Sequence, residues 1–445
     1  MKKTLFILSI FLFVLHSNAQ ITFQKTYGDT GNSDVGHSVV QTADGGYIIV
    51  GYTYILGNGA SDVYLIKTDA YGDTLWTKIF GGSALDRGNS VQQTSDGGYI
   101  ITGNTQSTVA GDADIFLIKT DSIGNLVWQK FFGGVDTESV SSVQQVTTGG
   151  YIISGITYSF GAGTSDMYLI RTDNNGDTLW TKTYGGVSND HAISVRQTSD
   201  GGFIMTGLTI NFAVVENVIL IKTGVNGNVI WKKYIGKNAD FDWGQAVDQT
   251  SDGGYIVFGI TSANGAGDFD FLLIKTDANG DTLWTKTFGG IDEDMGVSGQ
   301  QTTDGGYIFL GTTLSFGAGE NDLLLIKTNP SGDTLWTRTY GGIDEDWAAR
   351  IRQTSDGGYI ITGYTKSFGP GDSDVYLIKT DSLGNTNCNQ GYPAPLVTSP
   401  SPPVVTHMVT VTTPPTAITT ANFSVNSGSV VTTLCSTVGI STVNN

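Results

Sequence analysis

Cysteine, histidine and positive charge are all scarce in this chain. Its 445 residues include two cysteines and four histidines, and 23 lysines and arginines stand against 41 aspartates and glutamates, so the formal net charge is −18. A phosphate backbone is held by clustered Lys and Arg, which disfavours nucleic acid and anionic membranes as partners. Because no cysteine lies between residues 20 and 386, thiolate catalysis and cysteine-ligated zinc are excluded from that region.

Long apolar segments are scarce too. One runs from Leu5 to Leu15, between two lysines and a group of small residues that ends at Ala19. This order predicts a secretory signal peptide over residues 1–19 and a secreted mature chain, located in the extracellular space or at the cell surface. The segment is too short to span a bilayer and no later segment is apolar enough, so we expect no transmembrane segment.

Glycine, in contrast, is abundant and strictly ordered. It accounts for 61 residues, and paired glycines recur every 52 residues, beginning at 45, 97, 149, 201, 253, 305 and 357. Each copy holds four short apolar runs, and Asp-Gly-Gly units such as 96–98 supply the positive φ angles of hairpin turns. Each copy is therefore predicted to be a four-stranded antiparallel sheet. Since such sheets bury both faces only by stacking, seven copies predict an all-β fold, a seven-bladed β-propeller over residues 20–386.

The two ends of the repeat array indicate that the ring closes. Residues 23–28 match the fourth-strand pattern seen at 180–185, although no other strand of a copy precedes them. The last copy has no fourth strand and continues instead into residues 381–388. We therefore expect the N-terminal strand to complete the last blade, which removes exposed sheet edges.

The composition of the tail differs from that of the repeats. From Pro393 onward the chain is rich in Thr, Val, Pro and Ser, which predicts a linker or stalk over residues 387–445. Both cysteines, Cys388 and Cys435, lie in this tail. In an oxidising compartment they could pair and close it into a small module with a few strands, or they could remain as free thiols.

The repeat pattern resembles a known family. Gly-Tyr-Ile-Ile-Thr-Gly at 98–103, Asp-Val-Tyr-Leu-Ile-Lys-Thr-Asp at 62–69 and Gly-Asp-Thr-Leu-Trp-Thr-Lys-Thr-Tyr-Gly-Gly at 176–186 look like the bacterial secreted beta-propeller repeat family (SBBP). The resemblance covers residues 21–386 and implies a propeller fold. It also implies an exported surface or matrix module of Bacteroidota-type bacteria.

Two acidic positions recur through the copies. The first follows the fourth strand: Asp34, Asp86, Glu138, Asp190, Asp242, Asp294 and Asp346. The second begins the third strand: Asp62, Asp114, Asp166, Asp270, Asp322 and Asp374, with Asn217 in the remaining blade. Both sets are expected on one face of the disc. They either form an acidic rim that gathers cations or accept hydrogen bonds from their own loops, and their recurrence in every blade favours the second reading.

The richest acidic loops are Ile-Asp-Glu-Asp at 291–294 and 343–346, in neighbouring blades. Hard cations bind several carboxylate oxygens at once. Asp292, Asp294, Asp344 and Asp346 are therefore candidate Ca²⁺ ligands, although the fold is expected to require no cofactor.

Residues that differ between the blades are better candidates for recognising a ligand. The position after the first repeated acid varies most, and it supplies these candidates together with two neighbouring acids: Arg87, His191, Trp243, Met295, Trp347, Asp242 and Asp346. Tryptophan can stack on a sugar ring while carboxylates accept its hydroxyls, and Trp, Arg and Met are common in binding patches. The alternative is that these side chains only cover the loops beneath them.

Little in the sequence points to catalysis. His37 and His191 lie three copies apart at different loop positions, and no nucleophile elbow is present. The turn at 68–76 resembles the Asp-box of sialidases but has two residues between Asp and Gly where one is expected. An arginine triad for an acidic sugar would have to come from Arg87, Arg196, Arg350 and Arg352.

These observations predict a secreted, non-catalytic module that binds a glycan or a protein surface through its acidic loop face. One alternative is an exported scaffold without a discrete ligand site. The second alternative is a glycosidase or lyase, because acidic surfaces also offer paired carboxylates. The sequence leaves the ligand and the oligomeric state open.

Overall fold

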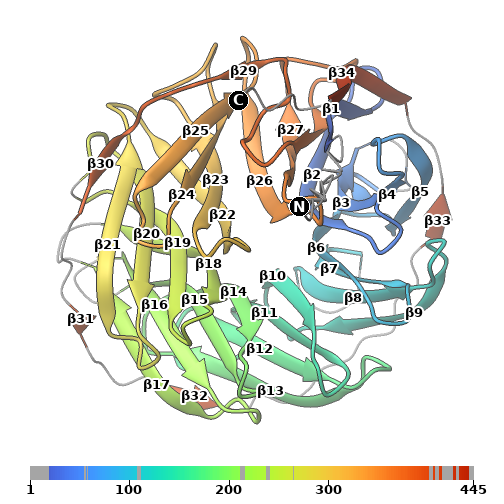
Figure 1. The fold of residues 1–445 in the computed structure, drawn as a ribbon. Helices are drawn as coiled ribbons and strands as arrows, with labels where there is room; N and C mark the ends of the chain where they lie inside the picture. The colour runs from blue at the N-terminus through green and yellow to red at the C-terminus, as the bar shows by residue number, and fades with distance from the viewer. Residues whose placement is uncertain are drawn as a thin grey trace, which may run out of the picture.

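The repeats fold into seven antiparallel sheets arranged radially as the blades of a propeller (Figure 1). The computed structural model describes residues 20–54, 57, 59–107, 112–210, 216–236, 241–263, 265–399, 404–405, 410–412, 424–426 and 430–439. The predicted signal peptide, residues 1–19, lies outside the described residues. The predicted fold class, an all-β seven-bladed propeller, is confirmed.

Four strands follow one another in each blade from the innermost to the outermost position. Blades 1 and 2 contain β2 (Asp34–Gln41), β3 (Tyr47–Thr53), β4 (Asp62–Thr68), β5 (Thr74–Gly81), and β6 (Asp86–Gln93), β7 (Tyr99–Thr105), β8 (Asp114–Thr120), β9 (Leu126–Phe132). Blades 3 and 4 contain β10 (Glu138–Gln145), β11 (Tyr151–Thr157), β12 (Asp166–Thr172), β13 (Thr178–Gly185), and β14 (Asp190–Gln197), β15 (Phe203–Ile210), β16 (Glu216–Thr223), β17 (Val229–Ile235). Blades 5 and 6 contain β18 (Asp242–Gln249), β19 (Tyr255–Thr261), β20 (Asp270–Thr276), β21 (Thr282–Gly289), and β22 (Asp294–Gln301), β23 (Tyr307–Thr313), β24 (Asp322–Thr328), β25 (Thr334–Tyr340). Blade 7 contains β26 (Asp346–Gln353), β27 (Tyr359–Thr365), β28 (Asp374–Thr380) and β1 (Gln20–Gly28).

The local sequence explains each blade. The third strand, for example β8, is buried along its whole length, as its continuous apolar run predicts for a strand between two neighbouring sheets. Gly97 adopts a φ of +85° in the first hairpin turn, a conformation that glycine reaches without steric cost. Each inner strand also carries a register shift, which in β6 falls between Gly88 and Ser90.

The ring is closed by the N-terminal strand, as predicted. Strand β1 pairs antiparallel with β28, so that Phe23 lies opposite Lys379. A repeated hydrogen bond also joins each blade to the next: the Ser95 N–H donates to Gln145 Oε1 at 2.9 Å. The same bond joins blade 7 to blade 1, where the Ser355 N–H donates to Gln41 Oε1 at 2.8 Å.

The outer-strand tryptophans pack between neighbouring blades. The ring centroid of Trp76 lies 5.9 Å from that of Tyr99 in the next blade, and a Cβ added at Gly124 would meet the Trp76 ring at 2.7 Å. The same contact recurs for Trp128, Trp180, Trp231, Trp284 and Trp336. Phe23 takes the seventh place against Tyr47, with centroids 6.0 Å apart.

The tail does not form a separate stalk in the described structure. Its strands are β29 (Gln390–Gly391), β30 (Leu396–Thr398), β31 (Val404–Val405), β32 (Thr410–Thr412), β33 (Ser424–Asn426) and β34 (Val430–Gly439). They add a fifth, antiparallel strand to blades 6, 5, 4, 3, 1 and 7 in that order. Figure 1 shows them around the outside of the disc. We call the described residues between 388 and 439 the belt.

The belt differs from the predicted stalk because short Val- and Thr-rich segments are well suited to pairing with an exposed sheet edge. The predicted option of a disulfide is realised: Cys388 and Cys435 are bonded across a separation of 47 residues. Such bonds are typical of oxidising compartments outside the cytoplasm. In the part of the chain that the structure describes, no helix is long and apolar enough to cross a membrane.

Candidate functional site

The acidic residues that follow the outer strands lie where predicted, on one face of the disc, which we call the loop face. Asp86 is fully buried, and its Oδ2 accepts hydrogen bonds from the Gly82 N–H at 2.7 Å and from Ser107 Oγ at 2.8 Å. Asp346 is buried in the same way, with bonds from the Gly342 N–H at 2.7 Å and Ser367 Oγ at 2.8 Å. These carboxylates accept hydrogen bonds from their own loops, which is the second of the two roles considered for the repeated acids.

The second acidic set lies beside the first. Asp62 is 1% exposed, and its Oδ2 accepts the Gly59 N–H at 3.0 Å. A Cβ added at Gly81 would lie 1.7 Å from Asp62 Oδ1, so the glycine that ends the outer strand leaves room for this carboxylate. The Asp86 N–H donates to the Ser61 carbonyl at 2.8 Å, which ties the two loops of neighbouring blades together.

The calcium candidates are divided between buried and exposed positions. Asp294 and Asp346 are buried in their own loops, whereas Asp292 and Asp344 are exposed. The N–H groups of Asp292 and Asp344 each donate to a serine of the same blade at 3.0 Å. Among the described residues, no group of three or more His, Cys, Asp or Glu side chains is placed to hold a metal ion. Calcium binding therefore stays a prediction.

Several ligand candidates contact their own or a neighbouring blade. Trp243 Nε1 donates to Glu216, and its ring lies 6.3 Å from that of Phe269. His191 Nε2 lies 3.0 Å from Ser165 Oγ, and burial lowers the pKa of this histidine. Met295 is half-buried opposite Thr312, and Asp242 is buried. A role of these residues in binding stays a prediction.

Trp347, in contrast, belongs to a group of aromatic side chains on blades 7 and 1, and Arg87 of blade 2 contacts this group. We call Tyr52, Tyr54, Trp347 and Tyr364 the aromatic patch. Trp347 stacks on Tyr364 with an interplanar angle of 15°, and its buried Nε1 has no hydrogen-bond partner among the described residues. Tyr52 and Tyr54 meet edge to face at 5.6 Å. The Arg87 guanidinium lies 4.6 Å from the Tyr52 ring and donates to the Tyr54 hydroxyl at 3.1 Å.

The two halves of the aromatic patch are electrostatically connected. Burial, with smaller contributions from Glu345, Tyr52 and Asp346, raises the pKa of Tyr364 to about 12. Tyr54 is 39% exposed, while the other three rings are half-buried. The patch therefore presents partly accessible aromatic surface, held in place by its own contacts, next to carboxylates and one guanidinium.

A groove of about 750 Å³ opens beside these loops, where blades 6 and 7 meet the start of the belt. Phe316, Phe368 and Ile343 line it together with Tyr392 of the belt, which is 68% exposed. The Tyr392 hydroxyl accepts a hydrogen bond from Gln390 Nε2 at 2.7 Å. Apolar walls with a few polar groups are the usual composition of ligand pockets.

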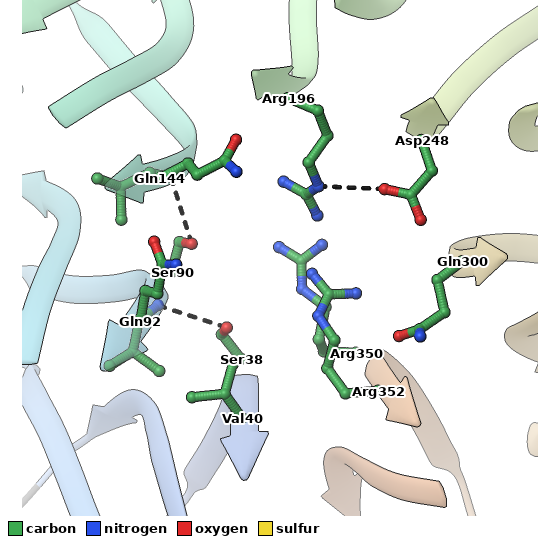
Figure 2. A pocket seen from close by; sticks show the side chains of 12 residues that line it. Ser38, Val40, Ser90, Gln92, Gln144, Arg196, Asp248, Gln300, Arg350 and Arg352 are labelled. Atoms are coloured by element: carbon green, nitrogen blue, oxygen red, sulfur yellow. Dashed lines mark hydrogen bonds and ion pairs between the residues drawn. The ribbon is translucent and has the colours of Figure 1, made fainter. Parts of the chain in front are cut away.

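The central channel contains a second kind of surface. A cavity of about 260 Å³ is lined by the inner strands, mainly at two repeated positions. The first series is Ser38, Ser90, Ser142, Ser194, Ala246, Ser298 and Arg350, and the second is Val40, Gln92, Gln144, Arg196, Asp248, Gln300 and Arg352. Figure 2 shows the guanidinium groups of Arg196, Arg350 and Arg352 turned toward one another in this cavity.

Sequence reasoning named these three arginines only as a test for sialidase chemistry and did not predict their meeting. Arg87, the fourth, lies apart in the aromatic patch. The sequence does show that these arginines are unusual for their positions. Five of seven copies have serine where the last copy has Arg350, and three have glutamine where it has Arg352. The repeated register shift in the inner strands changes which side chains face the channel, and this shift was not apparent from the sequence.

Comparisons with known proteins assign neither a family nor an activity to the chain. No protein family model matches the chain. The chain is 27% identical over 134 residues to regulatory protein FlaEY of Caulobacter vibrioides, a match that covers 26% of this chain and only 14% of that protein. A Dyadobacter fermentans protein of unknown function is similar with a TM-score of 0.44 and 11% identity, over 81% of this chain and 98% of that one. A NanB sialidase variant from Streptococcus pneumoniae is similar with a TM-score of 0.39 and 10% identity, over 84% and 70%. The resemblance to the secreted propeller family stays a prediction, and the chain is a seven-bladed propeller by its own sheet topology.

Proposed function

We propose that this protein is a secreted, non-catalytic module that binds a glycan on the loop face of blades 7 and 1. The observation that carries the proposal is the aromatic patch, where Trp347 stacks on Tyr364 beside Tyr52 and Tyr54. Aromatic rings with polar neighbours suit the alternating apolar and hydroxyl surfaces of a sugar ring.

The surroundings support a ligand longer than one sugar ring. The groove beside Ile343 and Phe368 lies between blade 6 and blade 7, the blade that carries Trp347. Its belt residue Tyr392 offers a further exposed ring, which the Arg338 guanidinium approaches at 4.5 Å from the ring centroid. A chain of sugars could contact both the aromatic patch and the groove.

Export of the chain is the second part of the proposal. It is supported by the signal-like segment at residues 1–19 and by the disulfide between Cys388 and Cys435. Location at the cell surface or in the extracellular space follows from that export.

A protein surface is the second candidate ligand, and one observation favours it. The loop face bears exposed aliphatic side chains in four blades: Val135, Val187, Ile291 and Ile343, with exposed fractions of 82%, 60%, 83% and 76%. Exposed apolar groups on one face are a common property of protein contact surfaces.

A glycan array probed with residues 20–445 tests the proposal. We expect binding to a polysaccharide fragment, weakened roughly tenfold or more by Trp347→Ala, since central aromatic anchors carry most of a binding energy. Tyr392→Ala should weaken binding of long fragments more than that of short ones.

Tyr158→Ala is the matched control, because Tyr158 is 42% exposed on the loop face of blade 3, at the position equivalent to Tyr54. Undiminished binding by Trp347→Ala would contradict the proposed site. If no glycan on the array is bound and the chain instead captures a protein assembly, the scaffold alternative is favoured. Release of a product from polysaccharide would favour a glycosidase or lyase.

A further inference from the structure

The cavity in the central channel is lined by net positive charge, whereas the chain as a whole is negatively charged. The chain carries a net charge of −18, yet its cavity lining contains three arginines and one aspartate, which gives +2 by subtraction. The chain has six arginines in all, so half of them line this one cavity. Like charges in a confined space repel one another, and such an arrangement is costly unless a counter-charge occupies it.

The aspartate does not neutralise the group. Asp248 Oδ1 lies 3.3 Å from Arg196 Nε, with side chains 25% and 19% exposed to the channel. Within the described residues, Arg352 makes one side-chain hydrogen bond, from Nη1 to the Ile351 carbonyl at 2.9 Å. The Nε of Arg350 is buried and has no hydrogen-bond partner among the described residues. Guanidinium donors therefore remain available toward the centre of the cavity.

The electrostatics of the arginines agree with this geometry. Burial, together with the nearby Arg196, lowers the pKa of Arg350 to about 10. Burial likewise lowers the pKa of Arg352, with further contributions from Arg196 and Arg350. The unfavourable interaction of these cations is what a bound anion would relieve.

We propose that the central channel is a binding site for a small oxyanion, most strongly a divalent one such as phosphate or sulfate, held by Arg196, Arg350 and Arg352. Arg350 and Arg352 lie two residues apart on β26 and project to the same side, while Arg196 faces them from β14 (Figure 2). Planar guanidinium groups bind phosphate, sulfate and carboxylate oxygens through paired hydrogen bonds. The amides of Gln92, Gln144 and Gln300 line the same cavity and can donate further bonds.

This site is separate from the proposed glycan site. Trp347 and Arg350 share strand β26, but Trp347 lies at the loop-face end and stacks on Tyr364, whereas Arg350 faces the channel. Anion binding can therefore be present or absent whatever the outcome of the glycan array.

The test compares phosphate, sulfate and acetate with chloride at equal ionic strength, using calorimetry and thermal melting of residues 20–445. We expect phosphate and sulfate to raise the melting temperature and to release heat on binding, because a ligand that binds only the folded state stabilises it. Acetate, with one charge, should bind at least about tenfold more weakly.

The decisive variant is Arg350→Ser with Arg352→Gln, because these are the residues that other blades carry at the same positions. It should fold, with a melting temperature in chloride no lower than that of the unmodified chain, and lose the response to phosphate. Arg338→Gln, on the outer strand β25, is the control that should keep it. Asp248→Asn removes the competing carboxylate and should tighten phosphate binding about tenfold.

Three results would overturn the proposal: equal melting temperatures in phosphate and chloride, a phosphate response that survives Arg350→Ser with Arg352→Gln, or weaker phosphate binding by Asp248→Asn. The last variant keeps all three arginines, so it remains informative if the double variant does not fold.

Discussion

In most blades, aspartates in the hairpin turn and aspartates on the loop face have pKa values shifted in opposite directions. In the hairpin turns, Asp96 accepts bonds from Thr94 and from the buried Lys119, whose Nζ lies 3.0 Å from Asp96 Oδ2. Partial burial raises the pKa of Asp96, but these bonds outweigh it and lower the pKa to about 2. On the loop face, burial raises the pKa of Asp322 to about 6, although backbone N–H groups of its loop oppose this shift.

The ion pair of the hairpin turn is present in six blades, and other residues replace it in blade 3. The pairs are Lys67–Asp44, Lys119–Asp96, Lys222–Asp200, Lys275–Asp252, Lys327–Asp304 and Lys379–Asp356. In blade 3 the turn has Thr148 in place of the aspartate, and Arg171 takes the place of the lysine. Arg171 donates to Thr148 Oγ1 at 3.3 Å and to the Thr172 carbonyl instead. Residues in contact have thus changed together.

The two groups of aspartates predict how stability depends on pH. Burial raises the pKa of Asp270, Asp322 and Asp374 to about 6, so between about pH 4 and 6 the folded state binds more protons and stability increases as the pH falls. Asp96, Asp200 and Asp252 have a pKa of about 2, so below about pH 4 the unfolded state binds more protons and stability is lost. The exposure of these hairpin aspartates moderates the second effect.

We therefore expect the highest melting temperature near about pH 4.5 and not at neutral pH. His37 and His191 oppose the increase, since burial lowers the pKa of both, but they are fewer than the buried aspartates. Calorimetric melts from pH 3 to 8 check this prediction. A melting temperature that increases steadily up to pH 8 would contradict it.

Strand β1 connects parts of the chain that are far apart in the sequence. It pairs on one side with β28 and on the other with β34 of the belt, so it lies inside a five-stranded sheet. Its side chains Phe23 and Tyr27 are fully buried, and the Tyr27 hydroxyl donates to the Gly72 carbonyl of blade 1 at 2.6 Å. It therefore joins the last blade, the first blade and the belt.

Deletion of residues 20–28 should lower the free energy of unfolding by more than about 5 kcal/mol, because truncation of one buried aromatic ring alone costs about 3–5 kcal/mol. Urea denaturation followed by tryptophan fluorescence measures the loss. A synthetic peptide of residues 20–28 should restore part of it by binding the open edge of β28. An unchanged urea midpoint would show that the ring does not depend on this strand.

The elements differ in how far they could be predicted from the sequence. Ring closure could be predicted because one outer strand is missing after Asp374–Thr380 and one is left over at 23–28. The belt could not, because strands such as Val404–Val405 contain only two residues and show no periodicity. The arginine cluster depends on which inner-strand residues face the channel after a register shift, which repeat counting does not reveal.

For the whole molecule, the disulfide joins the two ends of the belt. Cys388 follows the last repeat and Cys435 lies in β34, opposite Gln24 of β1. Between them the belt strands pair with blades 6, 5, 4, 3 and 1, in the direction opposite to that of the repeats. The bond therefore closes a covalent loop around the disc.

Replacing both cysteines by serine should lower the free energy of unfolding by about 4 kcal/mol, the loop-closure entropy of a 47-residue separation. Urea denaturation of the variant and of the unmodified chain gives the difference. The unmodified chain under reducing conditions is the control and should match the variant. Equal midpoints for the oxidised chain and the variant would contradict this contribution.

A circular stack of blades is weakest where two neighbours can part, because parting widens the circumference. The belt strands, joined end to end by the disulfide, oppose such widening at the six blades with which they pair. After a single proteolytic cut in a loop between two blades, the two fragments should therefore remain associated until the Cys388–Cys435 bond is reduced.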